Sequence, residues 1–526
     1  MRTRSVLTAS LSVLLLAIGI PARAAAPPAE FGSDYDDPRT PAPAVAVPHT
    51  RHCEVQIVDN QFRNFDPYRS TYTPPADCQG PWSKVVLRMH GAVKGVQYDR
   101  LGHLTIGGVG VFRTSTPEPS ADGIEWNVEK DVTSYSPLLR TTQPVVMELG
   151  NVVDDTYTGV LDIKVTLDFY TTDRRAPAAK TADEVLPLQD QTRDGADLRG
   201  TATLPKNTTR VLGEVYVTGS GGGCEEFWDT SAPASTGYSC PDGSPYREVD
   251  VSIDGKLAGI ALPYPYIYTG GWSNPYEWRP SPAPRAFDIK PVTYDLTPFA
   301  GLLADGRPHE FRIHVDGVPA GQSGWFTVPN LHVWTDAHRA RTTGALTSYA
   351  VSPLAKTEVT GTGSVNMTAS RTLKISGYVD TSAGRMHTTV ERNLSNVSKH
   401  TWDAGESHDA LDANWRDTET TISNGRVHRT DLDYGKNGLL TFLPNATIPG
   451  GYDVVTDLKI YDTIRTPGLT TTETYDGRAS WIYGVPRDQR HATGAQTVRF
   501  RATGHGCYDH TLAAVNGVYT KDFYRC

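Results

Sequence analysis

The sequence of 526 residues lacks an excess of basic side chains, because its formal net charge is −9. A protein that binds nucleic acid needs a basic face, so this balance argues against that class. Methionine is scarce, whereas Gly, Pro, Thr, Val and Tyr are abundant, which is typical of β structure with many turns. The chain is too long for one hydrophobic core, and we expect about two to four domains.

The sequence also lacks the short motifs of several classes of site. It has no C-x-x-C and no H-E-x-x-H, and its fifteen histidines show no metal-ligand spacing. The G-x-S-x-G, P-loop and Rossmann glycine patterns are absent as well. We therefore expect neither a metal nor a cofactor, and a serine-hydrolase mechanism is disfavoured.

Long hydrophobic runs are missing, apart from a short one at the N-terminus. Two arginines precede an apolar stretch at residues 11–20, and a small-x-small triplet follows at 22–24. This order is typical of a secretory signal, and the stretch is too short to favour the alternative, a membrane anchor. We predict a signal peptide over 1–24, a Pro/Ala-rich leader over 25–50, and secretion without membrane association.

Cysteine is also rare, with six residues, an even number that suits an oxidising compartment. The sequence alone does not choose among the pairings that six cysteines allow. The simplest hypothesis joins neighbours along the chain: Cys53–Cys78, Cys224–Cys240 and Cys507–Cys526.

Apolar and polar residues alternate in several stretches, notably 96–114, 160–170 and 209–218. Alternation with a period of two marks half-buried strands, so the sequence predicts an all-β fold of antiparallel sandwiches. We predict these units: a first sandwich at 51–175, a linker or edge segment at 176–205, a second sandwich at 206–340, and a β-rich accessory domain at 341–526.

Two charged turns are candidates for chemistry. Asp99 and Arg100 precede a predicted strand, and Glu225 and Glu226 follow a run of glycines. The alternative for both is a purely structural role. Asp99 and Arg100 would then be a solvated ion pair at a strand end, and Glu225 and Glu226 the acidic tip of a hairpin. The glycine run nevertheless suggests that the backbone there lies close to another part of the molecule or to a ligand. We expect Asp99 and Glu226 to face one cleft.

The segment 264–278 is rich in aromatic residues. Six of them lie among prolines and glycines in a predicted loop: Tyr264, Tyr266, Tyr268, Trp272, Tyr276 and Trp278. A core position for all of them is an alternative, but this density in a loop favours a binding surface. Flat aromatic faces suit the C–H faces of sugar rings.

Several long strings match a known family in order. They are PWSKVVLRMHGAVKGVQYDRLGHLTIGGVGVFRTSTPEP, GIEWNVEKDVTSY and ELGNVVDDTYTGVLDIKVTLDFY. They resemble the N-terminal half of the peptide N-glycosidase A family, and the resemblance runs from about Cys53 to Trp334. Peptide N-glycosidase F is a more distant relative, and its W-D-R and G-C-x-E-W motifs resemble residues 98–100 and 223–227. This resemblance implies two antiparallel jelly rolls side by side, with the acids in the cleft between them.

The resemblance also implies roles for single residues. Asp99 is expected to act as base or nucleophile, and Glu226 to hold the bridging water or supply a proton. Expected substrate-binding residues are Arg100, Trp272, Trp278, Arg279, Asn151 and Asp154. Asn151 stands where the distant relative has a third acid, and Asp154, Asp155 and Glu118 remain open as substitutes.

The implied reaction is hydrolysis of the amide that joins N-acetylglucosamine to asparagine, which releases the N-glycan and leaves aspartate. The expected substrates are N-glycopeptides and glycoproteins, and the enzyme is expected to be a monomer. Two alternatives stay open. A secreted carbohydrate-binding protein would use the aromatic loop without both acids, and a glycoside hydrolase would use two acids to cut a glycosidic bond.

Overall fold

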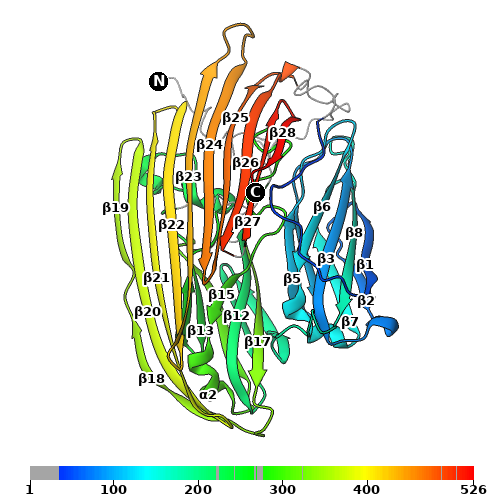
Figure 1. Cartoon of the computed structure of the whole chain (residues 1–526). Coiled ribbons are helices and arrows are strands. Elements are labelled where there is room, and N and C mark those ends of the chain that lie inside the picture. Colours follow the sequence, from blue (N-terminus) through cyan, green and yellow to red (C-terminus); the bar gives the residue numbers. More distant parts are fainter. Residues whose placement is uncertain are drawn as a thin grey trace.

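The computed structural model describes residues 35–220, 224–241, 243–265, 268, 276–322, 324–486, 489–504 and 506–526. Within these ranges the chain is almost entirely β structure in antiparallel sheets, which confirms the all-β prediction (Figure 1). None of the described helices is both long and apolar enough to cross a membrane. The short helical turns are η1 (Ala76–Cys78), η2 (Thr133–Tyr135), η3 (Leu138–Arg140), η4 (Glu225–Thr230), η5 (Ala234–Thr236), η6 (Thr297–Phe299) and α2 (Ala300–Leu303).

The first sandwich consists of two four-stranded sheets, with the orders β1-β8-β3-β6 and β2-β7-β4-β5. Alternation explains its core, because every second side chain of β8 faces inward, from Leu161 to Phe169. Its strands are β1 (His52–Phe62), β2 (Tyr68–Tyr72), β3 (Trp82–Val93), β4 (Leu101–Ile106), β5 (Val109–Ser115), β6 (Ile124–Asp131), β7 (Gln143–Leu149) and β8 (Leu161–Thr171).

The second sandwich pairs a five-stranded sheet, β10-β11-β16-β13-β14, with a four-stranded sheet, β15-β12-β17-β9. Its strands are β9 (Glu184–Pro187), β10 (Gln189–Asp194), β11 (Asp197–Ala202), β12 (Thr208–Gly219), β13 (Glu248–Ile253), β14 (Lys256–Ala261), β15 (Val292–Asp295), β16 (His309–Asp316) and β17 (Trp325–Thr335). The segment 176–205 thus adds strands to this sandwich, and β9 and β10 lie at sheet edges. Of the two predictions for residues 176–205, an edge segment agrees better with these strands than a linker does.

The two sandwiches lie side by side (Figure 1), and β5 packs against β17. Asn330 on β17 bridges them, since its amide donates to the Gly110 carbonyl at 2.8 Å and accepts from the Gly110 N–H at 3.0 Å. Tyr216 donates to the Val111 carbonyl at 3.0 Å. The jelly-roll connectivity and the exact domain boundaries stay predictions.

Residues 343–524 form one large antiparallel sheet of long strands, seen along the left and top of Figure 1. Strands that follow one another in sequence are neighbours from β20 to β28. The strands are β18 (Thr343–Val351), β19 (Ala355–Gly361), β20 (Ser364–Thr381), β21 (Gly384–Trp402), β22 (His408–Ser423), β23 (Arg426–Pro444), β24 (Tyr452–Thr466), β25 (Leu469–Tyr483), β26 (Thr493–Gly504), β27 (Gly506–Val515) and β28 (Val518–Tyr524).

The large sheet is not a separate appendage, because its inner face shares one hydrophobic core with the second sandwich. Trp415 and Tyr434 of the sheet belong to the same buried cluster as Val249 and Ile260 of the sandwich. The backbones also approach closely: a Cβ on Gly377 would lie 2.1 Å from the Pro298 carbonyl oxygen. The sheet therefore stabilises the second sandwich, and the assignment of 341–526 as an accessory domain stays a prediction.

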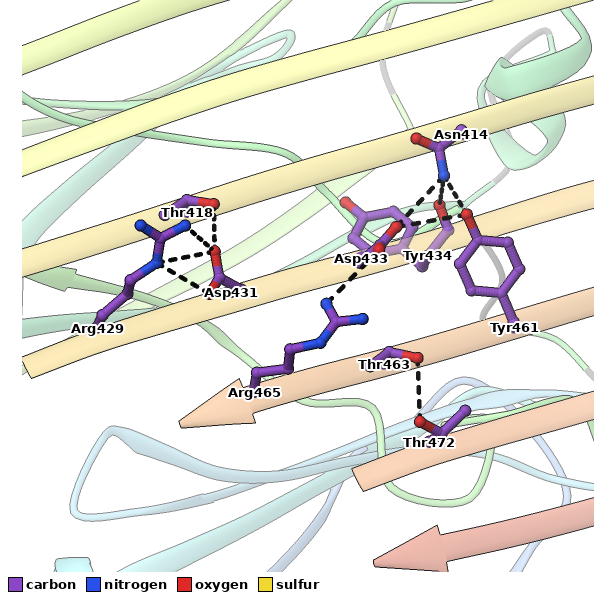
Figure 2. Close-up of polar contacts among 10 residues, drawn as sticks. All are labelled: Asn414, Thr418, Arg429, Asp431, Asp433, Tyr434, Tyr461, Thr463, Arg465 and Thr472. Atoms are coloured by element: carbon purple, nitrogen blue, oxygen red, sulfur yellow. Dashed lines mark hydrogen bonds and ion pairs between the residues drawn. The ribbon is translucent and has the colours of Figure 1, made fainter. Parts of the chain in front are cut away.

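The other face of the large sheet carries cross-strand polar contacts (Figure 2). Asp431 accepts hydrogen bonds from Thr418 and Arg429, both at 2.7 Å, and Thr463 lies 3.2 Å from Thr472. Tyr461 covers Gly435, where a Cβ would lie 2.5 Å from its ring. Such pairs on a half-exposed face fix strand register rather than form a cavity.

All three neighbouring cysteine pairs are bonded, which confirms the predicted pairing. The bonds are Cys53–Cys78, Cys224–Cys240 and Cys507–Cys526, with Cα–Cα separations of 6.1, 5.7 and 5.7 Å. In the described part of the leader, Tyr35, Pro38 and Pro41 are buried, and most residues from 42 to 50 are exposed. Tyr35 is buried against the first sandwich, and the Asp36 N–H donates to the Gly517 carbonyl at 2.8 Å. The predicted signal peptide lies outside the described residues.

Candidate active site

Asp99 lies on a short turn that leads into β4 of the first sandwich. Backbone and side-chain bonds fix this turn: the Arg100 N–H donates to Thr116 Oγ1 at 2.9 Å, and the Thr116 N–H donates to the Arg100 carbonyl at 2.9 Å. Arg100 Nη2 also donates to Gln97 Oε1 at 2.8 Å. The half-buried Asp99 side chain is therefore presented from rigid backbone.

Glu226 lies on η4, which follows β12 of the second sandwich, and its neighbour Glu225 anchors that turn. Glu225 is fully buried and forms a bidentate ion pair with Arg247, at 2.6 and 2.8 Å. Trp325 Nε1 donates to the same carboxylate at 2.5 Å. With its oxygens occupied in this way, Glu225 holds η4 onto the second sandwich.

The large sheet holds the same turn from the opposite side. Lys436 on β23 pairs with Asp229 on η4 at 2.8 Å, and both side chains are almost completely buried. The Cys224–Cys240 disulfide packs against Val365 and Trp402 of the large sheet. The turn that carries Glu226 is thus fixed both to the second sandwich and to the large sheet.

The structure brings the two charged turns together. Burial and, as the smaller cause, the negative charge of Asp99 together raise the pKa of Glu226 to about 8. Tyr268, from the aromatic loop, feels both acids as well: burial raises its pKa well above the usual value, and Glu226 and Asp99 add to this effect. Two acids contributed by different sandwiches therefore act on one another at a single place.

Two arginines place positive charge near Tyr268 and the two acids. The positive charges of Arg113 and Arg100 act on Tyr268 in the opposite sense and lower its pKa. Arg113 comes from the middle of β5, whose seven residues are all buried. Burial lowers the pKa of Arg113 to about 9, and its Nη2 donates to Thr218 Oγ1 at 2.5 Å. A single charged residue in a buried strand was the sequence signal for Arg113, which the sequence analysis missed.

Arg279, expected to bind substrate, is engaged in an ion pair with the buried carboxylate of Glu118. Its guanidinium also lies 4.7 Å from the centre of the Tyr276 ring. The backbone that follows is bound to β5, because the Ser115 N–H donates to the Ala286 carbonyl at 2.7 Å. Glu118, one of the substitutes for a third acid, therefore fastens this loop to the first sandwich.

Trp278 is covered by the large sheet rather than displayed to solvent. Its exposed fraction is 3%, and its ring packs edge to face on Tyr475 with 4.4 Å between centroids. Leu458 and Ile460 belong to the same buried cluster. This placement differs from the exposed platform expected from the sequence, because the sheet that covers the ring lies far away along the chain. Trp272 lies outside the described residues.

The burial of Trp278 leads to a prediction for stability. We expect Trp278→Ala to lower the free energy of unfolding by about 3–5 kcal/mol, the cost typical of deleting a core aromatic side chain. Urea denaturation followed by circular dichroism measures this loss. Phe65→Ala is the control, because Phe65 is 72% exposed and should cost no more than about 0.5 kcal/mol. A change of that small size for Trp278→Ala would contradict the core position.

Asn151 and Asp154 lie on the loop between β7 and β8, beside the Asp99 turn. Asn151 is completely buried, and its Nδ2 donates to the carbonyls of Phe62 and Gly159 at 3.0 and 3.1 Å. Asp154 is exposed and accepts two backbone N–H bonds at 2.7 Å within its own turn. These hydrogen bonds stabilise the loop, and none of them involves Asp99 or Glu226.

No group of three or more metal-ligating side chains occurs in the described part of the chain. The ionisable groups that the structure brings together are the two acids, with Tyr268 and the arginines around them. Two carboxyl groups in one place, one of them with a raised pKa, are suited to acid–base catalysis on a polar bond.

Comparisons with known proteins point to one family. A family model described as "Peptide N-acetyl-beta-D-glucosaminyl asparaginase amidase A" matches residues 41–352, more than half of the chain. A relative from Prunus dulcis, "Peptide-N4-(N-acetyl-beta-glucosaminyl)asparagine amidase A", is 32% identical over 381 residues. The aligned part covers 65% of this chain and 66% of the relative, so the chain spans just under two thirds of the relative's length.

Solved structures of similar enzymes match at low identity. PNGase F, a glycosylasparaginase from Flavobacterium meningosepticum, is 13% identical with a TM-score of 0.36, and the match covers 54% of this chain and 96% of that one. PNGF-II is 14% identical with a TM-score of 0.37, and the match covers 55% of this chain and 66% of that one.

Proposed function

The chain belongs to the peptide N-acetyl-beta-D-glucosaminyl asparaginase amidase A family, and we propose that it hydrolyses the amide bond between N-acetylglucosamine and asparagine. The products are the glycan, as a glycosylamine that then loses ammonia, and a peptide with Asp in place of Asn. The observation that carries the proposal is the meeting of Asp99 and Glu226, where burial raises the pKa of Glu226 to about 8. Its substrates are N-glycopeptides and glycoproteins.

The proposed mechanism assigns one part of the reaction to each acid. An amide carbonyl is a poor electrophile, so its hydrolysis needs an activated water and a proton for the leaving nitrogen. Asp99 takes a proton from the water as the new C–O bond forms; in the alternative, Asp99 attacks the carbonyl itself, and water then hydrolyses the resulting anhydride to free Asp99 and the product Asp. Glu226, which is protonated below about pH 8, gives its proton to the nitrogen as the C–N bond breaks. Arg100 donates to the carbonyl oxygen or to a sugar hydroxyl.

Location and assembly are part of the proposal. Three disulfides suit an oxidising compartment, which supports a secreted enzyme that acts outside the cell. We propose that it acts as a monomer, since both acids come from one chain.

The experiment that tests this function is a mass measurement on a glycopeptide after incubation with the protein. The amidase leaves a sugar-free peptide whose former glycosylated Asn has become Asp. A glycoside hydrolase would leave Asn with or without one sugar, and a carbohydrate-binding protein would leave the glycopeptide intact. Either of these results would reject the proposal.

The raised pKa of Glu226 leads to a prediction for the pH dependence of the reaction. Glu226 must carry a proton to donate it, and its pKa is about 8, so kcat/KM should fall as the pH rises through about 8. Below that pH the group stays protonated, because its pKa lies far above the usual value of 4.5. Steady-state rates across this pH range provide the measurement. The slower Glu226→Gln variant should lose this decline, and its persistence would assign the decline to another group.

A further inference from the structure

A groove with a volume of ≈ 570 Å³ lies between the two sandwiches. Arg69, His103 and Glu148 line it from the first sandwich, and Arg193, Ser220 and Trp325 from the second. This volume falls within the roughly 300–1,000 Å³ of pockets that hold small ligands or a few residues of a larger one. The groove is thus large enough to hold part of a substrate.

The groove adjoins the two acids. His103 follows Asp99 by four residues, so the backbone between them spans at most about 13 Å at ~3.3 Å per residue. Trp325, in the wall of the groove, donates to Glu225 on the turn that carries Glu226. Arg113 connects the two places electrostatically, because the charges of Tyr268 and of Glu148 both act on it. A substrate bound at the acids can therefore extend into the groove.

The groove carries positive charge in a chain whose net charge is −9. Arg69 and Arg193 line it against a single carboxylate, Glu148, and the charge of the buried Arg113 acts on His103 in the same wall. The guanidinium of Arg193 is already oriented, because it donates to the side chain of Thr327 at 2.9 Å and to its carbonyl at 2.5 Å. Oriented cations of this kind favour a carboxylate ligand.

His103 adds a buried polar group to the wall. Only 3% of it is exposed, and its ring packs on Phe326 with 4.7 Å between centroids. The backbone of Phe112 acts on the ring, but neither nitrogen forms a regular hydrogen bond within the described residues. His103 is therefore a buried polar group beneath the surface of the groove, and the charged side chains of Arg69, Arg193 and Glu148 are the polar groups that a ligand would meet.

The scissile bond joins a glycan to a peptide, so two surfaces must lead away from the acids. The loop at 276–289 packs on β5 and on the large sheet, whereas the charged groove lies between the two sandwiches. We propose that the groove binds the peptide part of the substrate and prefers a segment with an acidic side chain near the glycosylated asparagine. This inference rests on the proposed function and adds a peptide subsite to it.

The test compares two glycopeptides that carry the same neutral glycan, one with Asp or Glu near the glycosylated Asn and one with Gln or Asn there. Wild-type enzyme should show a KM for the acidic peptide roughly two- to fivefold lower, as expected for one or two partly exposed charge contacts. Arg69→Gln should remove most of this preference, and Glu148→Gln should strengthen it. Arg140→Gln, an exposed arginine on η3 of the same sandwich, is the matched control and should change nothing.

Three results would overturn the inference. They are equal KM values for the two peptides, an equal effect of Arg69→Gln on both, and a preference that follows sialic acid on the glycan instead of acid in the peptide. Binding of both labelled glycopeptides, measured by fluorescence anisotropy, reports on the groove without turnover. A protein that discriminates in binding but never converts Asn to Asp would reject the proposed function and keep the groove as a peptide site.

Discussion

Asp99→Asn is expected to slow the conversion of Asn to Asp by about 10³- to 10⁴-fold, the upper range for the loss of a general base. A carboxamide has nearly the same shape as a carboxylate but cannot take a proton or attack the carbonyl at neutral pH. The fold should survive, because Asp99 is a half-buried turn residue and its turn is held by the bonds between the neighbouring Arg100 backbone and Thr116. The mass of the released peptide gives the rate, and circular dichroism checks the fold.

The double variant Asp99→Asn/Glu226→Gln should be no slower than the slower single variant, because groups that act as a unit do not contribute additively. Asp122→Asn is the control, since Asp122 is exposed on the segment before β6 of the same sandwich. Glu225→Gln is unsuitable for that purpose, because Glu225 is buried in its ion pair with Arg247. A folded Asp99→Asn protein that works at the wild-type rate would remove Asp99 from the mechanism.

The parts of the site that the sequence predicted depend on local signals. Alternating apolar residues placed Asp99 at the start of a strand, and the glycine run placed Glu226 just after one. The cysteine pairs were predictable because each joins neighbours along the chain, 16 to 25 residues apart. Secondary structure, turns and short disulfide loops all depend on residues that are close in sequence.

The parts that sequence reasoning missed depend on distant partners. Glu225 and Glu226 are chemically identical neighbours, and only the positions of Arg247 and Trp325 make the first an anchor. The burial of Trp278 likewise depends on Tyr475, almost 200 residues away by the numbering. Strand patterning gives no information about which sheet will cover a loop, so the aromatic residues could not be divided into core and surface from the sequence.

The large sheet should matter for catalysis as well as for stability, and Lys436→Met tests this. The substitution keeps much of the side-chain volume but leaves Asp229 as a buried carboxylate without the charge of Lys436. Removing one partner of a buried ion pair costs about 3–5 kcal/mol, so we expect a loss of this size in urea denaturation. Lys459→Met is the control on the same sheet, because its pair with Asp476 is exposed at 3.5 Å and should cost less than about 1 kcal/mol.

The double variant Lys436→Met/Asp229→Leu separates stability from positioning. Replacing both charges by apolar groups should recover most of the lost stability, since the desolvation of the pair is then avoided. Asp229 lies three residues after Glu226 on η4, and the pair ties this turn to the large sheet. Without that tie, kcat/KM should stay about 10- to 100-fold below wild type, because small displacements of a catalytic group are costly. Recovery of both stability and full kcat/KM would show that the second sandwich alone positions Glu226.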